Sequence, residues 1–205
     1  MKVELHLHTS RYSDCATNTP EEMMAELLRS GYHAVFITEH NAVWPGRELN
    51  ELRGQFPGLR IFPGVERQLH AHHILVLGTN DREYLEVPGE MELLERARSL
   101  GHLTVLAHPY RYEGGADLLE QRLRPDAMEH LTNNHLPEPA MKARDAAESF
   151  GLPLVNAGDS HSLGMIGQFW IETRWPLRQA QDVRRAVVEG AYENRTHLGA
   201  QGSAE

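Results

Sequence analysis

Short apolar runs alternate with amphipathic stretches along most of this chain. The continuous apolar run at 34–38 is typical of a strand buried on both faces, and we expect further strands at 59–63, 74–78, 103–107, 126–129 and 152–155. Residues 3–8 alternate apolar and polar side chains instead, which predicts a further strand at the start of the chain. Helical spacing of apolar residues predicts helices at 20–30, 44–55, 89–100, 138–150 and 178–189. This alternation is typical of an α/β barrel or a doubly wound sheet.

One helix start and one strand reversal can be predicted from local signals. Thr19 is suited to cap the first helix, Pro20 to open it, and Glu22 to complete a capping box. Only about seven residues separate Glu66 from His73, whereas a parallel crossover needs a dozen or more. We therefore expect the fourth strand to run antiparallel to the third, which would place His73 beside Glu66.

The composition is that of an ordered globular protein, with 40% hydrophobic and 24% charged residues in a chain of 205. No linker or internal repeat divides the chain, so we expect a single barrel domain over 1–198 and a loose tail over 199–205. The single cysteine, Cys15, excludes an intrachain disulfide framework and fits a reducing compartment. We find no signal peptide and no run of about 18 apolar residues, so we expect a cytoplasmic protein with no membrane partner.

The charge of the chain bears on its partners. A net charge of −9 argues against nonspecific binding of nucleic acid, which usually needs a basic face. It is compatible with a small phosphorylated substrate, because bound divalent metals reverse the local sign of the charge.

Histidine and acidic residues recur where the predicted strands end. Thirteen histidines occur in the chain, and His6 and His8 alternate with Leu5 and Leu7, so both imidazoles should project from one strand face, with Leu5 and Leu7 on the other. In a barrel of parallel strands the carboxyl ends form one rim, and that rim carries the chemistry. The residues placed there are His6, His8, His40, Glu66, His108, Asp159 and His161. Imidazoles and carboxylates suit Zn, Mn or Fe, which predicts a metal site.

The sequence leaves open which histidine at the start of the fourth strand is the metal ligand. His70 and His72 compete with His73, and alternation favours His73 because it shares a face with Leu75 and Leu77. We interpret the histidines outside the strand-end pattern as structural or exposed: His33, His102, His130, His135 and His197.

Five segments, taken together, resemble the motifs of the polymerase and histidinol phosphatase (PHP) superfamily. In chain order they are His6-Leu7-His8-Thr9 with Asp14, Thr38-Glu39-His40-Asn41, Gly64-Val65-Glu66, Ala107-His108-Pro109 and Gly158-Asp159-Ser160-His161-Ser162. The resemblance extends from residue 3 to about 170. It implies a distorted, TIM-like (β/α)7 barrel of seven strands, with two or three divalent metal ions (Zn, Mn or Fe) at the C-terminal rim. Members hydrolyse phosphate esters or serve as exonuclease modules of bacterial DNA polymerases.

The resemblance also implies a role for each matching residue. Four residues would hold the first metal: His6, His8, Glu66 and Asp159. Glu66 would bridge to a second metal, also held by His73 and His108. A third metal would be held by Asp14, His40 and His161. The residues expected to carry catalysis are Glu66, His108, Asp159 and His161.

The expected activity is hydrolysis of a small phosphorylated metabolite, as in histidinol phosphatases, by a metal-activated hydroxide. Arg111 is the best-placed clamp for the phosphate, ahead of Arg11 and Arg67, although a solvated surface arginine is the competing interpretation. The alternative functions are a nuclease or nucleotide phosphodiesterase, an amide hydrolase, and a non-catalytic, metal-containing binding module.

Two features depart from the superfamily pattern. Glu39 stands where the second motif usually has Asp, and we expect it to orient His40 or a neighbour. The chain is also compact, with no room for the helical subdomain that larger members insert.

Overall fold

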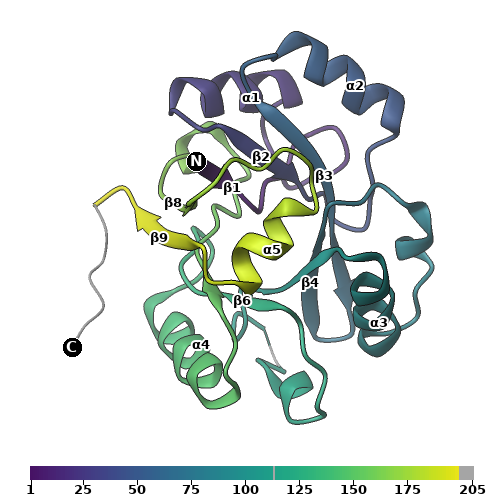
Figure 1. The fold of residues 1–205 in the computed structure, drawn as a ribbon, viewed down its shortest axis with the longest axis vertical. Coiled ribbons are helices and arrows are strands. Elements are labelled where there is room, and N and C mark those ends of the chain that lie inside the picture. The colour runs from purple at the N-terminus through teal and green to yellow at the C-terminus, as the bar shows by residue number, and fades with distance from the viewer. Residues whose placement is uncertain (113, 199–205) are drawn as a thin grey trace.

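A curved sheet of nine strands forms the centre of the computed structural model, which describes residues 1–112 and 114–198. The strand order is β7-β6-β5-β4-β3-β2-β1-β8-β9 (Figure 1). The strands are β1 (Lys2–Glu4), β2 (Ala34–Ile37), β3 (Arg60–Leu69), β4 (His72–Leu77), β5 (Leu103–Ala107), β6 (Ala127–Glu129), β7 (Leu154–Val155), β8 (Phe169–Thr173) and β9 (Tyr192–Thr196). The helices are α1 (Pro20–Arg29), α2 (Gly46–Gln55), α3 (Glu90–Leu100), α4 (Pro137–Phe150) and α5 (Asp182–Val188).

Strand direction sets which chain segments meet at each end of the sheet. β1, β2 and β3 are parallel to one another, as are β5, β6 and β7. β4 runs antiparallel to both β3 and β5, so the predicted reversal is confirmed. The end of β3 and the start of β4 therefore lie at the same rim as the ends of the parallel strands.

The expected seven strands are fewer than the nine observed, and the expected tail at 199–205 lies outside the described residues. The two additional strands are β8, antiparallel to β1, and β9, antiparallel to β8. Neither strand has a continuous apolar sequence. β8 buries only Ile171 and Thr173, and β9 is mostly polar. β1 is also shorter than predicted, since regular pairing ends at Glu4 and only an isolated bridge joins Leu7 to Ser160.

Side chains, rather than a ladder of strand pairing, join the two outer strands of the sheet. Asn194 accepts a hydrogen bond from the Asn156 amide (2.7 Å) and donates one to the Leu154 carbonyl (2.8 Å). The Tyr192 hydroxyl donates to the same carbonyl (2.7 Å). We call these contacts of Tyr192 and Asn194 with residues 154–156 the side-chain seam. With the bridge from Leu7 to Ser160, it brings the sheet close to a closed barrel.

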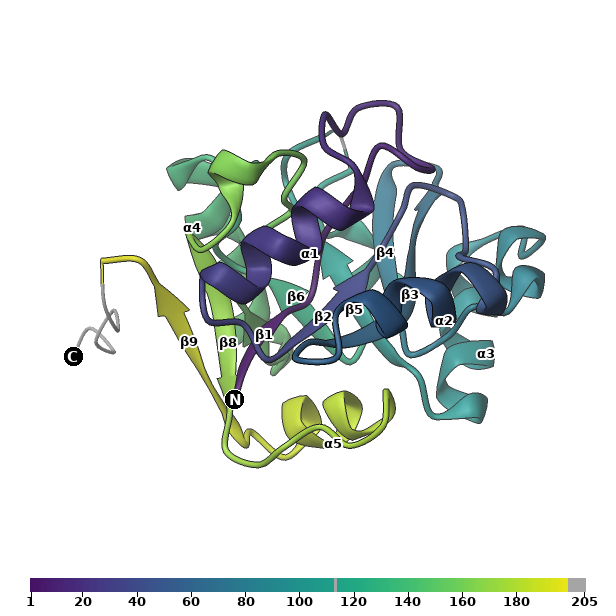
Figure 2. The same cartoon turned by 90° about the horizontal axis from the view of Figure 1, so that it is seen from above.

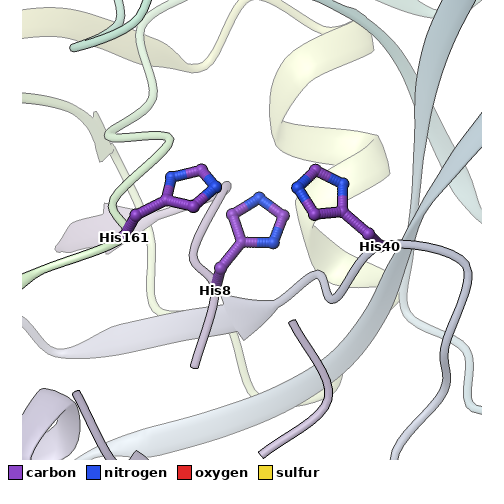
Figure 3. A group of neighbouring side chains, drawn as sticks. All are labelled: His8, His40 and His161. Carbon is purple, nitrogen blue, oxygen red and sulfur yellow. The ribbon is translucent and has the colours of Figure 1, made fainter. Parts of the chain in front are cut away.

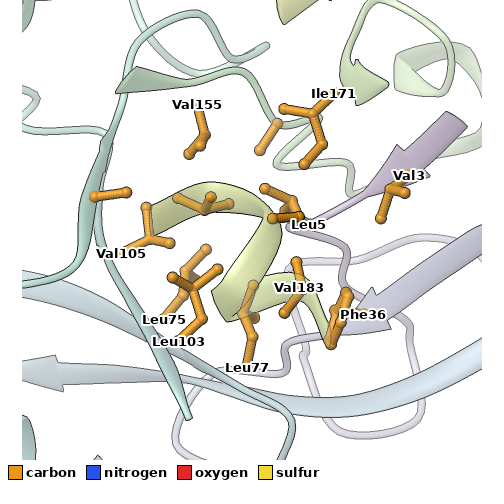
Figure 4. Close-up of a cluster of buried hydrophobic side chains, with 14 of the residues drawn as sticks. Val3, Leu5, Phe36, Leu75, Leu77, Leu103, Val105, Val155, Ile171 and Val183 are labelled. Atoms are coloured by element: carbon orange, nitrogen blue, oxygen red, sulfur yellow. The ribbon is translucent and has the colours of Figure 1, made fainter. Parts of the chain in front are cut away.

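Three apolar clusters hold the helices to the sheet. α5 lies across the end of the barrel opposite the loop that follows β1 (Figure 2). Its Val183 side chain packs into the barrel interior among strand residues such as Leu77 and Leu103 (Figure 4). Outside, α1 and α2 pack against β2 and β3, whereas α3 and α4 pack against β3–β6. Among the described residues, no helix has the length and apolar character needed to cross a membrane.

The predicted start of α1 is confirmed. The Thr19 hydroxyl accepts from the Glu22 amide (3.2 Å), while the Glu22 carboxylate accepts from the Thr19 amide (2.9 Å). This capping box satisfies two amides that the helix itself cannot. It fixes where the loop after β1, which carries candidate ligands, returns to the barrel.

Leu77→Ala is expected to lower the free energy of unfolding by about 2–5 kcal/mol, because Leu77 is fully buried in the interior cluster and its loss leaves a cavity. Thermal denaturation would show this as a fall in Tm of about 5–15 °C. Leu100→Ala, at an exposed position on α3, is the matched control and should change Tm little. Equal Tm values for the two variants would contradict the assignment of the core.

Candidate metal centre

His6 and His8 converge because the chain leaves regular pairing after Glu4. The Leu7 carbonyl accepts from the Thr38 amide (2.9 Å), and the His8 amide donates to the Ser160 carbonyl (3.0 Å). The two imidazole Nε2 atoms lie 2.9 Å apart, as the alternation predicted. The expectation that Leu5 and Leu7 share a face is wrong, because Leu5 packs in the interior cluster and Leu7 under α1 and α2.

Two buried carboxylates complete a group of four with these histidines. Glu66 Oε2 lies 3.3 Å from His6 Nε2 and 3.2 Å from His8 Nε2. Asp159 Oδ1 lies 3.4 Å from each of the same two nitrogens. All four residues are buried, although they come from three well-separated segments of the chain. They form the group predicted for the first metal.

The spacing of three of these atoms fits a cation. A tetrahedral metal with bonds of about 2.0–2.1 Å separates its ligand atoms by about 3.3 Å, close to the 2.9–3.3 Å that separate His6 Nε2, His8 Nε2 and Glu66 Oε2. Asp159 Oδ1 lies outside this compact group of three but within 3.4 Å of both nitrogens. Glu66 Oε2 and Asp159 Oδ1 are also buried without a hydrogen bond of good geometry from any described residue, although His40 Nδ1 lies 2.8 Å from Oε2. Since unpaired buried carboxylate oxygens are costly, both are explained most simply as ligand atoms.

The second oxygen of Glu66 faces a different pair of histidines. Oε1 lies 2.7 Å from His73 Nδ1 and 3.0 Å from His108 Nε2. The two oxygens of Glu66 are thus directed to two groups of nitrogens, as bridging requires. His72 instead contacts Glu90 (3.1 Å) and Asp117 (2.7 Å), so the structure brings His73 and not His72 to the centre.

His40 and His161 approach the centre from opposite sides of His8 (Figure 3). Their rings each lie 4.2 Å from the His8 ring, and nitrogens of all three lie within 4.8 Å of one another. His40 Nδ1 is also 2.8 Å from Glu66 Oε2. Asp14, predicted to share a metal with His40 and His161, is exposed at the edge of the adjoining cavity. Like Asp159 and His108, it lies outside the compact groups of three ligand atoms found among the described residues.

The imidazoles and carboxylates of this group are buried together, so they shift one another's pKa values strongly. Burial alone would lower the pKa of His6, but the carboxylates of Asp159, Glu129 and Glu66 raise it well above its ordinary value. Burial likewise opposes ionisation of Glu66, yet the neighbouring imidazoles hold the pKa of its carboxyl well below the usual range. Burial and His8 lower the pKa of His161 to about 4. The raised pKa values of His6 and His8 favour protonation in the metal-free protein, so protons would compete with a cation for these nitrogens.

Glu129 is a part of the centre that the sequence analysis did not identify. Its Oε1 accepts from His6 Nδ1 (2.7 Å), and its Oε2 accepts from the His108 amide (2.7 Å). A carboxylate on Nδ1 fixes the tautomer that leaves Nε2 free to bind metal. The signal was present in the sequence, because Glu129 ends the sixth strand as other candidates end theirs.

Glu129→Gln is expected to weaken metal binding about 10- to 100-fold, because one of the two N–H groups facing it would lose its acceptor. Competition between the protein and a chromogenic chelator for Zn²⁺ measures the change. Glu189→Gln, at an exposed position after α5, is the control. Unchanged affinity in Glu129→Gln would mean that this carboxylate serves only packing of the barrel.

Glu39 orients the centre through Ser13 rather than by direct contact with His40. The Glu39 carboxylate accepts from the Thr9 amide (3.0 Å) and from the Ser13 hydroxyl (2.6 Å). The Ser13 oxygen in turn accepts from the His40 amide (3.2 Å) and lies 3.3 Å from His8 Nδ1. The longer side chain found in place of Asp thus holds the loop after β1 against the metal ligands.

A cavity of about 740 Å³ opens beside the centre. It is lined by residues Tyr12, Ser13, Asp14, Cys15, His40, Gln68, His70, Ala71, His73 and Tyr112. Of the three arginines considered for phosphate binding, Arg111 lies beside the ligands, with Nη1 3.4 Å from Asp159 Oδ2. Arg11 pairs with Glu48, and Arg67 is largely buried against Asn41.

Comparisons with known proteins agree with this architecture. Residues 137–192 match the model of a family described as PHP-associated. The chain is 25% identical to the uncharacterized protein MJ0417 of Methanocaldococcus jannaschii over 187 residues. The alignment covers 84% of this chain and 70% of that protein.

Solved structures share the fold at low sequence identity. One is a two-domain protein of Bacteroides vulgatus containing a predicted PHP-like metal-dependent phosphoesterase (TM-score 0.73, 19% identity, 96% of this chain). The present chain spans 65% of the length of that protein. Another is an amidohydrolase of Chromobacterium violaceum with bound sulfate and no metal (TM-score 0.63, 15% identity, 79% of this chain and 88% of that one).

Proposed function

We propose that this chain, a member of the PHP superfamily, is a metal-dependent hydrolase whose substrate is a small phosphorylated metabolite. One observation carries the proposal. Glu66 Oε2 and Asp159 Oδ1 are buried without hydrogen bonds, and they face His6 and His8 at distances suited to one cation. The cavity reaches this group, because His40 and His73 line it and both contact Glu66.

The residues of the centre would have different roles in hydrolysis. Divalent cations held by these ligands would polarise phosphoryl oxygens and lower the pKa of a coordinated water toward neutrality. Glu66 directs one oxygen to each of two groups of nitrogens, so it can hold two cations close together. His108 and Asp159 each complete one group, and His161 approaches from the third side.

Two features favour phosphate over other electrophiles. Arg111 offers a guanidinium beside Asp159, where it can pair with phosphoryl oxygens as they bind. The Chromobacterium protein of the same fold holds sulfate, an anion of similar shape and charge to phosphate. The net charge of −9 disfavours a strand of nucleic acid as substrate. Cys15 lines the cavity, but burial raises the pKa of its thiol, so it is poorly suited as a nucleophile.

A second candidate function is hydrolysis of an amide bond. The description of the Chromobacterium protein as an amidohydrolase favours it, and an activated water would attack a carbonyl carbon as readily as phosphorus. The two candidates share the metal centre and differ in what Arg111 would contact.

The test is metal analysis of the purified protein, followed by assays loaded with Zn²⁺, Mn²⁺ or Fe²⁺. The panel contains phosphomonoesters, phosphodiesters, single-stranded DNA and N-acyl amino acids. Turnover confined to phosphomonoesters is the expected result, and Arg111→Ala should then raise KM for them.

Other outcomes separate the alternatives. No bound metal after supplementation would overturn the proposal altogether. Turnover of N-acyl amino acids alone would establish the amide hydrolase, and turnover of diesters or DNA would establish the nuclease. Bound metal without hydrolysis across the panel would favour a non-catalytic, metal-containing binding module.

A further inference from the structure

The turn between β6 and α4 contributes no expected metal ligand, yet it contacts two segments that do. Asn133 donates from its side-chain amide to the carbonyls of Gly158 and Met165. Asn134 donates from its amide to the carbonyl of Asp159 (3.0 Å) and to its Oδ2 atom (2.8 Å). His135 Nε2 lies 2.6 Å from the carbonyl of Pro109, next to His108. The turn therefore links the segments that follow β5 and β7.

Asp159 has particular need of such contacts. Its φ of 46° lies in the left-handed region, which costs free energy for a residue other than glycine. A free carboxylate can also rotate and offer either oxygen to a neighbour. The metal group needs a single arrangement, with Oδ1 toward His6 and His8.

The side-chain amide of Asn134 stabilises both the backbone conformation and the carboxylate orientation of Asp159. Through the Asp159 carbonyl it holds the left-handed backbone, and through Oδ2 it fixes the rotation of the carboxylate. Because Oδ2 is occupied, Oδ1 is the oxygen left unpaired and directed at the nitrogens of the metal group. Arg111 Nη1 also lies near Oδ2, but at the longer distance of 3.4 Å, and the Arg111 side chain is one-third exposed.

We propose that Asn134 is a positioning residue for the metal centre, selecting Oδ1 of Asp159 as the ligand atom and stabilising the backbone conformation that presents it. The inference rests on the proposed function, since it presumes that a cation binds between Asp159 and the histidines. It concerns a residue with no contact to the cation or the substrate.

The test compares Asn134→Ala, which removes the donor, with Asn134→Asp, which places a second carboxylate against Asp159. Zn²⁺ affinity is measured by competition with a chromogenic chelator, and Tm is measured on the chelated proteins. The control is Asn50→Asp, at an exposed asparagine on α2. We expect Asn134→Ala to lower Zn²⁺ affinity about 10- to 100-fold. We expect Asn134→Asp to lower it further and Asn50→Asp to leave it unchanged.

The outcomes distinguish this inference from the proposed function. If the wild-type protein binds no Zn²⁺, Mn²⁺ or Fe²⁺, the proposed function itself fails. If the wild type binds metal and both Asn134 variants bind it with wild-type affinity, the positioning role is wrong. A fall in the Tm of the chelated variants without a change in Zn²⁺ affinity also overturns it, because Asn134 would then serve stability alone.

Discussion

Glu66→Gln is expected to abolish hydrolysis almost completely and to reduce the metal content of the purified protein. Both oxygens of Glu66 face imidazole nitrogens, with His73 and His108 on one side and His6 and His8 on the other. An amide keeps the shape but replaces one of these oxygens with an NH₂ group, which cannot bind a cation. Loss of several kcal/mol of transition-state stabilisation corresponds to a fall in kcat/KM of roughly a thousandfold or more.

The measurement pairs kinetics with metal analysis by mass spectrometry. Glu51→Gln, which makes the same chemical change at an exposed position on α2, is the control and should retain activity and metal. Circular dichroism of both variants tests whether the fold is intact. Wild-type kcat/KM in Glu66→Gln would show that the two groups of histidines do not share a carboxylate in catalysis.

Removal of metal by a chelator is expected to abolish activity and to lower Tm by roughly 10 °C. A ligand present at a thousand times its dissociation constant stabilises a protein by about 4 kcal/mol, and each kcal/mol moves Tm by about 2–4 °C at this size. Added Zn²⁺ or Mn²⁺ should restore both quantities. A Tm that is unaffected by chelation would contradict a metal bound among buried ligands.

The gap in Tm between metal-loaded and chelated protein should widen as pH rises from 6 to 8. In the metal-free protein the pKa values of His6 and His8 are raised, chiefly by nearby carboxylates that outweigh burial. Their protonation therefore stabilises the metal-free fold at low pH, and this contribution is lost as pH rises through the raised values. Metal binding follows the opposite trend, because protons compete with the cation for the same nitrogens. A constant gap in thermal scans across this range would contradict this linkage.

The candidate ligands could be predicted because their positions follow from short-range patterns. His108 stands directly after an apolar strand, Asp159 follows another strand by four residues, and the short connection after Glu66 forced the reversal that brings His73 beside it. By contrast, β9 is stabilised by its pairing with β8 and by the side-chain seam, and its polar sequence carries no periodic signal. Asn134 lies in a turn, so its contact with Asp159 depends on the packing of loops and could not be derived from spacing.

Asp14 is the predicted ligand whose side-chain position the motif alone defines least. Its place in the motif assigns it to a metal with His40 and His161, whereas its side chain is exposed at the edge of the cavity. The position of a residue in a motif fixes its backbone location to within a loop. The direction of a side chain on that loop is set by neighbours such as Ser13, which Glu39 holds against the ligands.

The side-chain seam has a consequence for where the barrel can open locally. Hydrogen bonds between neutral groups contribute about 1 kcal/mol each, so separating Asn194 and Tyr192 from residues 154–156 takes far less free energy than unfolding the barrel. The freed segment continues within a few residues to Asp159, a candidate ligand. Asp159 itself is held by other contacts, because Asn134 donates to it and the next residue, Ser160, is bridged to Leu7. The barrel can therefore open locally at the seam while the candidate ligands stay together, and amide hydrogen exchange should be faster at residues 154–156 than beside the ligands.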